Sequence, residues 1–514
     1  MVHYRSTRGG VRGLSFEQAV LTGLAADRGL LVPEAGEFPT LPADALDKWA
    51  SLSYQELAAE VMGLFIDESE ISRAQLRALV AKSYNSSTFR AEEVAPVVKV
   101  TDQMLVLELF HGPTFAFKDI ALQFLGNLFE FFLQRKNKAL PAGAPKHQIT
   151  VVGATSGDTG SSAIYGLRGK ENVEVFILFP EGRVSAIQQR QMTTVLDENI
   201  HNVAVKGTFD DCQAIVKDLF ANADFKAKSS TTSGPTSARE HGVTGEIAFS
   251  VPTGNFGDIL AGFYAKKLGV PIGKLIVATN ENDILHRFFS TGKYHRRDIE
   301  HTISPSMDIC VSSNFERYLF ALSGENHDIL RGWMQGFEQT NELTISGELL
   351  TKAQDEMASY AVLQDEVRST IAEYKKVHRY LYDPHSAIGA AAAMHYGQDA
   401  LTDKPNSAVV VVGTAHYGKF LPVVSKALGV AETEIQQHPI LKSLESLPTR
   451  LAVANNSSAT VAEHIRKTIA KKNQKACGDC FSLWSSAPTE CKLATFALAA
   501  ATVAAAFLVA RRSK

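Results

Sequence analysis

The sequence predicts an α/β protein with twisted, mostly parallel sheets and flanking helices, an α-rich N-terminal part and a C-terminal apolar helix. The sheet region is predicted by short apolar runs, rich in β-branched residues, that recur from Val94 onward and alternate with helical stretches. Strands that alternate with helices form βαβ units, so the sheets are expected to be mostly parallel.

The N-terminal part, residues 15–82, shows the apolar spacing of amphipathic helices. Apolar side chains recur about every three or four residues, first at Phe16, Ala19, Val20 and Leu24 and later at Leu57, Val61 and Leu64. This period is typical of helices that bury one face. We therefore expect this part to be mainly helical.

The strands expected in the sheet region are of ordinary length, 104–110, 148–152, 173–179, 247–251, 275–279 and 408–412. In parallel sheets of this kind, ligands bind outside the carboxyl ends of the strands. Three loops with unusual composition follow the strands 104–110, 148–152 and 247–251. Their positions predict one shared site.

Lys118 lies in the first of these loops, between the strand 104–110 and a predicted helix that Asp119 could cap. Desolvation by Phe115 and Phe117 would lower the pKa of the Lys118 amine and expose a nucleophile suited to imine chemistry. The alternative is a surface lysine that only begins a helix. The segment taken alone leaves both interpretations open.

The other two loops have the composition of anion-binding turns. Residues 153–162 read GATSGDTGSS, and residues 252–258 read PTGNFGD. Small residues and glycines at the start of a helix present backbone N–H groups to an anion. Either loop alone is more typical of an ordinary βα turn, but a lysine together with both loops is a more specific combination.

Composition restricts the other functional classes. The 514 residues carry a net charge of −3, and Lys and Arg are spread along the chain, so no nucleic-acid surface is predicted. Five cysteines are few for this length, as in proteins with reduced thiols. Cys477, Cys480 and Cys491 lack a second ligand pair, so we interpret them as part of a solvated linker rather than a metal or redox site.

One lysine and two anion cradles are the groups needed to hold pyridoxal phosphate and an anionic substrate. The chain resembles the fungal and bacterial threonine synthases, within the fold type II pyridoxal phosphate enzymes, over about residues 4–469. The resemblance rests on motifs in order along the chain, YRSTRGG (4–10), HGPTFAFKD (111–119), SGDTG (156–160), GNFGD (254–258), TNEND (279–283), SSNFER (312–317), DPHS (383–386) and GTAH (413–416).

The resemblance implies conversion of O-phospho-L-homoserine and water to L-threonine and phosphate, with pyridoxal 5'-phosphate as cofactor and no metal. Lys118 would bind the cofactor covalently and transfer protons. The cofactor phosphate would lie against Gly254, Asn255, Phe256, Gly257 and Asp258, and the pyridine nitrogen beside the Thr414 hydroxyl. The substrate carboxylate would bind the loop of Thr155, Ser156, Gly157, Asp158 and Thr159.

Two segments depart from the family pattern. Residues 229–237 read SSTTSGPTS, where the family has a helix with an Asn-Ser-Ile-Asn-Trp-Ala-Arg motif, and a missed exon would give the same pattern as a real loss. After Thr414, His416 and Lys419 enclose Tyr-Gly instead of the usual Pro-Ala, which removes a proline restraint. A threonine synthase-like phospholyase and a membrane-tethered pseudoenzyme that binds the cofactor therefore remain alternatives.

We divide the chain into an N-terminal domain (1–93), a catalytic region of two interleaved α/β subdomains (94–470), a linker (471–492) and a transmembrane helix (493–510). The last segment is an uncharged run of 18 residues before Arg511 and Arg512, and about 17–25 residues span a bilayer. An alanine-rich helix docked on a partner would look similar. No signal or transit peptide precedes Tyr4, so we expect a cytoplasmic enzyme with a tail anchor in an intracellular membrane.

Overall fold

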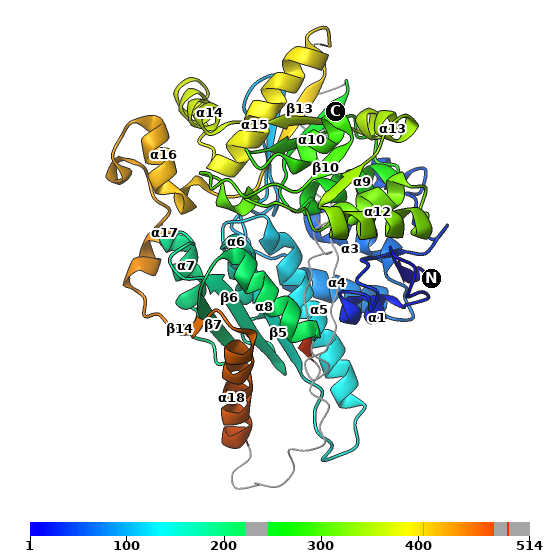
Figure 1. The fold of residues 1–514 in the computed structure, drawn as a ribbon, viewed down its shortest axis with the longest axis vertical. Coiled ribbons are helices and arrows are strands. Elements are labelled where there is room, and N and C mark those ends of the chain that lie inside the picture. The colour runs from blue at the N-terminus through cyan, green and yellow to red at the C-terminus, as the bar shows by residue number, and fades with distance from the viewer. Residues whose placement is uncertain (222–244, 405, 477–490, 493–514) are drawn as a thin grey trace.

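The computed structural model describes residues 1–221, 245–404, 406–476 and 491–492. Two sheets lie in separate lobes, with β13 in the upper lobe and β5, β6 and β7 in the lower lobe of Figure 1. The N-terminal helices lie beside them, where α4 packs against α5. The fold is therefore α/β with largely parallel sheets, as the sequence predicts.

The N-terminal part combines helices with one small antiparallel sheet. Its elements are β1 (Tyr4–Ser6), α1 (Phe16–Thr22), β2 (Leu31–Pro33), α2 (Ala45–Trp49), α3 (Tyr54–Phe65) and α4 (Arg73–Ser83). The predicted apolar positions Phe16, Val20, Leu57 and Val61 are buried in the main core. Ser side chains cap α1, α3 and α4 in capping boxes, which explains where these helices begin.

The upper sheet has the strand order β12-β9-β8-β13-β4-β3, and only the β3–β4 pair is antiparallel. Its strands are β3 (Val97–Lys99), β4 (Met104–Glu108), β8 (Ile247–Pro252), β9 (Leu275–Thr279), β12 (Met357–Ala361) and β13 (Ala408–Gly413). Every residue of β8, β9 and β13 is buried. Strands covered on both faces read as continuous apolar runs, which is why the sequence revealed them.

The lower sheet has the order β14-β7-β6-β5-β15 and is parallel throughout. Its strands are β5 (Ile149–Ala154), β6 (Val173–Pro180), β7 (Ile200–Lys206), β14 (Ala452–Asn455) and β15 (Cys491–Lys492). The chain builds β3 and β4 of the upper sheet, crosses to β5, β6 and β7, and then returns to complete the upper sheet before adding β14. The two sheets are therefore interleaved in sequence.

Helices cover both sheets and connect the lobes (Figure 1). Those nearest the lower sheet are α5 (Lys118–Lys138), α6 (Asp158–Leu167), α7 (Ala186–Thr193), α8 (Phe209–Ala221), α17 (Pro439–Ser443) and α18 (Ser458–Ala476). Those nearest the upper sheet are α9 (Gly257–Leu268), α10 (Ile284–Thr291), α11 (Phe315–Leu322), α12 (His327–Thr340), α13 (Glu348–Glu356), α14 (Gln364–Val377), α15 (Pro384–Tyr396) and α16 (Leu421–Leu428). A small two-stranded antiparallel sheet pairs β10 (Lys293–His295) with β11 (Glu342–Thr344).

The C-terminal region contains more regular structure than the expected linker 471–492. Helix α18 continues to Ala476, and β15 pairs with β5. Within the described residues, no helix has both the length and the apolar character that a membrane span requires. The expected span, residues 493–510, and the segment 229–237 both lie outside the described residues.

Candidate active site

A cavity of about 410 Å³ lies where the loops after β4, β5 and β8 meet. The predicted site residues that line it are Lys118, Thr155, Ser156, Asp158, Thr159, Gly254, Asn255, Phe256, Gly257, Asp258 and Thr414. The loops follow the carboxyl ends of parallel strands, which is the usual ligand position in such sheets. Gly157 is the predicted site residue that does not line the cavity.

Lys118 is the first residue of α5, and its amine lies 4.5 Å from the centre of the Phe117 ring. Burial lowers the pKa of this amine, and the charge of Asp158 partly offsets that effect. A lowered pKa increases the fraction of neutral, nucleophilic amine. The ring of Phe115, the other phenylalanine expected to desolvate Lys118, has the Arg90 guanidinium 3.5 Å from its centre.

Asp119 does not cap α5 as expected, because the helix already begins at Lys118. Its buried carboxylate instead accepts hydrogen bonds of 2.7 Å from the backbone N–H and the hydroxyl of Thr114. The Phe117 N–H donates to the Thr414 carbonyl at 2.9 Å. These bonds fix the turn that holds Lys118 beside Thr414.

In the loop after β5, the Thr155 hydroxyl accepts hydrogen bonds from the N–H groups of Gly157 (3.0 Å) and Gly160 (2.8 Å). Gly157 has φ 137°, and a Cβ added there would lie 2.4 Å from Cδ of Gln188. Glycine is therefore required for both conformation and space. The Thr155 hydroxyl and Gly157 therefore shape the loop, and Thr155, Ser156 and Thr159 line the cavity.

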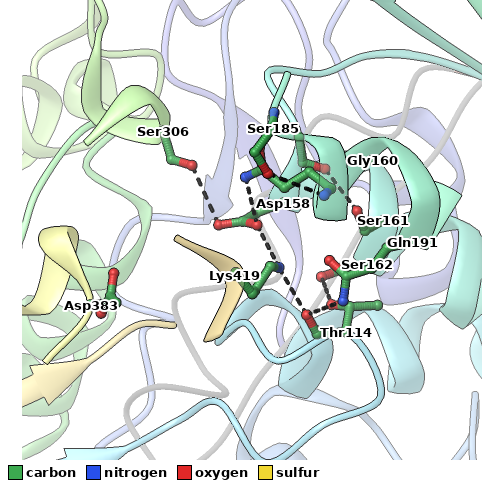
Figure 2. Close-up of polar contacts among 12 residues, drawn as sticks. Thr114, Asp158, Gly160, Ser161, Ser162, Ser185, Gln191, Ser306, Asp383 and Lys419 are labelled. Carbon is green, nitrogen blue, oxygen red and sulfur yellow. Dashed lines mark hydrogen bonds and ion pairs between the residues drawn. The ribbon is translucent and has the colours of Figure 1, made fainter. Parts of the chain in front are cut away.

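Asp158 is the centre of a buried polar network (Figure 2). Its carboxylate forms an ion pair of 2.5 Å with Lys419, whose side chain is fully buried, and Lys419 also donates to the Thr114 carbonyl at 2.8 Å. Gln188 donates to the carboxylate at 3.0 Å and Ser306 at 3.4 Å. Burial alone would raise the pKa of Asp158, but the Lys419 and Lys118 charges lower it well below its usual value.

Residues just before α11 form hydrogen bonds to the loop after β8 and hold it in place. The Asn314 side chain donates to the Asn255 carbonyl at 3.0 Å, and the Ser313 hydroxyl donates to the Asn255 side chain at 3.1 Å. Phe256 has the left-handed φ of 61°, which is uncommon for a residue with a side chain. Its ring packs against Phe315, with centroids 5.1 Å apart, and this contact fixes the conformation.

Two polar side chains of this cavity are buried without a hydrogen-bond partner among the described residues. They are Asp258, for both carboxyl oxygens, and Thr414, for its hydroxyl. Buried polar atoms normally have partners, so these mark positions for a bound molecule. An amine, a free hydroxyl and a glycine loop at the start of α9 fit pyridoxal phosphate, whose aldehyde, ring nitrogen and phosphate need such groups.

Sequence reasoning had not assigned a role to several residues of this site. Gln188 gave only the signal of a helix cap, because Ser185 and Gln188 form the capping box of α7. Lys419 was noted only for its place after β13. Ser306 gave no signal at all, although its N–H donates to His385 at 3.3 Å.

The comparisons with known proteins agree with this geometry. Three family models match, "Threonine synthase N terminus" over residues 3–84, "Pyridoxal-phosphate dependent enzyme" over 85–414 and "Threonine synthase, C-terminal" over 386–465. The threonine synthase of Schizosaccharomyces pombe is 46% identical over 466 residues, which cover 83% of this chain and 89% of that protein. That of Saccharomyces cerevisiae is 44% identical over 501 residues, covering 87% and 93%.

Solved structures give the same result. Threonine synthase from yeast matches with a TM-score of 0.81 at 40% identity, covering 91% of this chain and 99% of that one. A pyridoxal phosphate-bound threonine synthase from Brucella melitensis matches with a TM-score of 0.80 at 37% identity and the same coverage. The chain belongs to the threonine synthase family of pyridoxal phosphate-dependent enzymes.

Proposed function

We propose that the cavity around Lys118 converts O-phospho-L-homoserine and water to L-threonine and phosphate. The observation that carries this proposal is the meeting of one amine of lowered pKa with two glycine-containing loops in a single cavity. The substrate has a carboxylate and a phosphate, and the cofactor has a phosphate. A site for them therefore needs more than one anion-binding surface.

Lys118 is the proposed catalytic residue. Its amine would bind pyridoxal phosphate covalently, and when bound the cofactor supplies the electron withdrawal that makes the substrate's C–H bonds acidic. Once free, the same amine would carry protons between the carbon atoms of the substrate. The lowered pKa suits both tasks, since each needs the neutral amine.

The loop of Gly254, Asn255, Phe256, Gly257 and Asp258 is proposed to hold the cofactor phosphate. Helix α9 follows directly, so its first N–H groups and the positive end of its dipole face that position. A Cβ on Gly254 would lie 3.3 Å from the Met307 backbone, which leaves little room for a side chain. The Thr414 hydroxyl would meet the ring nitrogen.

The loop of residues 155–159 is proposed to hold the substrate carboxylate. The negative charge of Asp158 would oppose this, but the Lys419 ion pair neutralises it. The Thr155 hydroxyl accepts two backbone N–H groups but keeps its own O–H, so Thr155, Ser156 and Thr159 each bring a hydroxyl donor to the cavity. We also propose that the N-terminal domain ends at residue 93 and that the catalytic region ends at residue 470.

The direct test supplies the full-length protein with pyridoxal phosphate and O-phospho-L-homoserine and measures threonine and phosphate together. Equal amounts of the two products are expected. Phosphate without threonine would replace the proposal with a phospholyase. Cofactor absorbance without either product would indicate a pseudoenzyme.

For residues 493–510 we propose a membrane anchor, on the sequence pattern alone. A chain that ends at Lys492 loses the proposed anchor but keeps α18 and β15, so it should keep its activity. Carbonate washing of membranes compares the full and shortened proteins. Release of the full protein into the soluble fraction would contradict the anchor.

A further inference from the structure

Asp258 is the most unusual ionisable residue of the cavity. Its side chain belongs to the first turn of α9 and lines the cavity, and the residue is only 4% exposed. Neither carboxyl oxygen has a hydrogen-bond partner within the described parts of the chain. Leaving a buried carboxylate without donors is costly, so the arrangement indicates that a bound ligand completes it.

Lys118 is the cation whose charge acts on Asp258, whereas Lys419 and Arg317 are engaged with other groups. The Lys419 ammonium is ion-paired with Asp158, and the Arg317 guanidinium donates to the Leu31 carbonyl (3.1 Å) and the Asn314 side chain (2.6 Å). Of the elements that pack against α9, strands β8 and β9 carry no titratable side chain, and α11 carries Glu316, Arg317 and Tyr318. The other ionisable residues that line the same cavity are Lys118, Asp158, Lys217, Asp308, Arg317 and His385.

A phosphate bound at the start of α9 would face the Asp258 carboxyl at close range. Two anions in a poorly solvated cavity repel each other strongly. A protonated carboxyl group, in contrast, has an O–H that donates a hydrogen bond to phosphate oxygen. We propose that Asp258 takes up one proton when the cofactor phosphate binds and donates it in a hydrogen bond to that phosphate.

The electrostatics of the cavity favour this protonation. Burial raises the pKa of Asp258 to about 7, and the charge of Lys118 is the opposing influence. A negative phosphate nearby raises the pKa further, so a group that is partly ionised at neutral pH becomes protonated in the complex. No bond other than O–H is formed, and the proton comes from solvent.

The test is calorimetric titration of the full-length protein after hydroxylamine has removed its cofactor. Pyridoxal 5'-phosphate and pyridoxal are titrated at pH 8 in two buffers of different ionisation enthalpy, which gives the number of protons taken up. Both ligands carry the aldehyde that reacts with Lys118, so their difference isolates the phosphate. We expect close to one additional proton with pyridoxal 5'-phosphate. Equal proton numbers for the two ligands would overturn the proposal without any variant.

The variant Asp258→Asn tests whether Asp258 is the group that takes up the additional proton. The additional uptake should disappear in this variant, and should persist in Asp308→Asn, the control for another, half-buried carboxyl of the same cavity whose pKa burial also raises. Above pH 7 the wild-type affinity for pyridoxal 5'-phosphate should fall about tenfold per pH unit relative to Asp258→Asn. A thermal unfolding scan checks that each variant is folded. An undiminished proton difference in folded Asp258→Asn would refute the assignment.

This inference rests on the cofactor-binding part of the proposed function and not on the reaction itself. The titrations contain no substrate. A protein that makes no threonine could still show the proton uptake, and an active enzyme could lack it. The two failures are therefore distinguishable.

Discussion

The loops after β5 and β8 have similar sequences but treat their aspartates in opposite ways. Asp158 and Asp258 each lie in the first turn of a helix, α6 or α9, and both are 4% exposed. Asp158 is bound by Lys419, Gln188 and Ser306, and its pKa is lowered. Asp258 has no partner among the described residues, and its pKa is raised to about 7.

The difference separates a structural charge from a ligand-dependent one. The Asp158 carboxylate has its counter-charge and hydrogen-bond donors without any bound molecule, because the protein itself supplies them. It ties the loop after β5 to residues from the upper sheet's loops. The Asp258 carboxyl group, in contrast, has no hydrogen-bond partner among the described residues until a ligand binds. Similar local sequences therefore give one preorganised loop and one loop whose energy depends on the ligand.

Lys118 interacts electrostatically with both aspartates, and its removal should have the largest effect. Lys118→Ala should lower turnover by more than about 10³-fold, because it removes both the covalent attachment and a proton carrier worth about 10²–10⁴-fold. Borohydride reduction and peptide mapping should label Lys118 in the parent protein and in Lys419→Met. A label on any other lysine would contradict the assignment.

Lys419→Met tests whether Asp158 depends on its ion pair. The variant leaves a buried carboxylate without its cation, and breaking such a pair costs about 3–5 kcal/mol. Chemical denaturation should show this loss. Adding Asp158→Asn in the same chain should recover a large part of the lost stability, as a double-mutant cycle reveals. Additive losses would mean that the two residues do not act as a pair.

Asp258→Asn should stabilise the folded protein, whereas Lys419→Met should destabilise it. The pKa of Asp258 is raised from 3.8 to about 7 in the folded protein, so its destabilising effect is fully present above pH 7 and decreases as the pH falls toward 4. Without cofactor, the variant should therefore gain about 1–3 kcal/mol at pH 8 and less at pH 5. Thermal unfolding at both values measures this. A loss of stability at pH 8 would remove the contrast with Asp158.

Asn255→Ala should produce the smallest change. Its side-chain oxygen accepts hydrogen bonds from the N–H and hydroxyl of Ser313, which hold the loop after β8 in place. We expect cofactor affinity to fall about tenfold, with turnover at saturating cofactor nearly unchanged, because a non-reacting phosphate contributes binding common to ground and transition states. Fluorescence titration and saturation kinetics separate the two. Reduced turnover at full affinity would contradict this.

The strands and loops were predictable because the relevant signals are local. Residues 275–279 were expected as a strand and form β9, and the loops after β5 and β8 contain enough glycine and small residues to mark a turn. The start of α5 was misjudged at Asp119, whose short-range bonds to Thr114 compete with capping.

The partners of Asp158 were not predictable for a different reason. Lys419, Gln188 and Ser306 come from three separate segments, and only the crossing of the chain between the two sheets brings them together. The residues next to Lys419 gave no sign that its side chain is fully buried. The opposite states of Asp158 and Asp258 could therefore be recognised only in the three-dimensional structure.

The position of β13 has a consequence for biosynthesis on the ribosome. This strand, residues 408–413, inserts between β4 and β8, which precede it by long stretches of chain. Until it emerges, β4 and β8 each present an unpaired backbone edge, the kind of surface that leads nascent chains to aggregate. We therefore expect the upper sheet to close only late in translation, and chaperones to hold the growing chain until then.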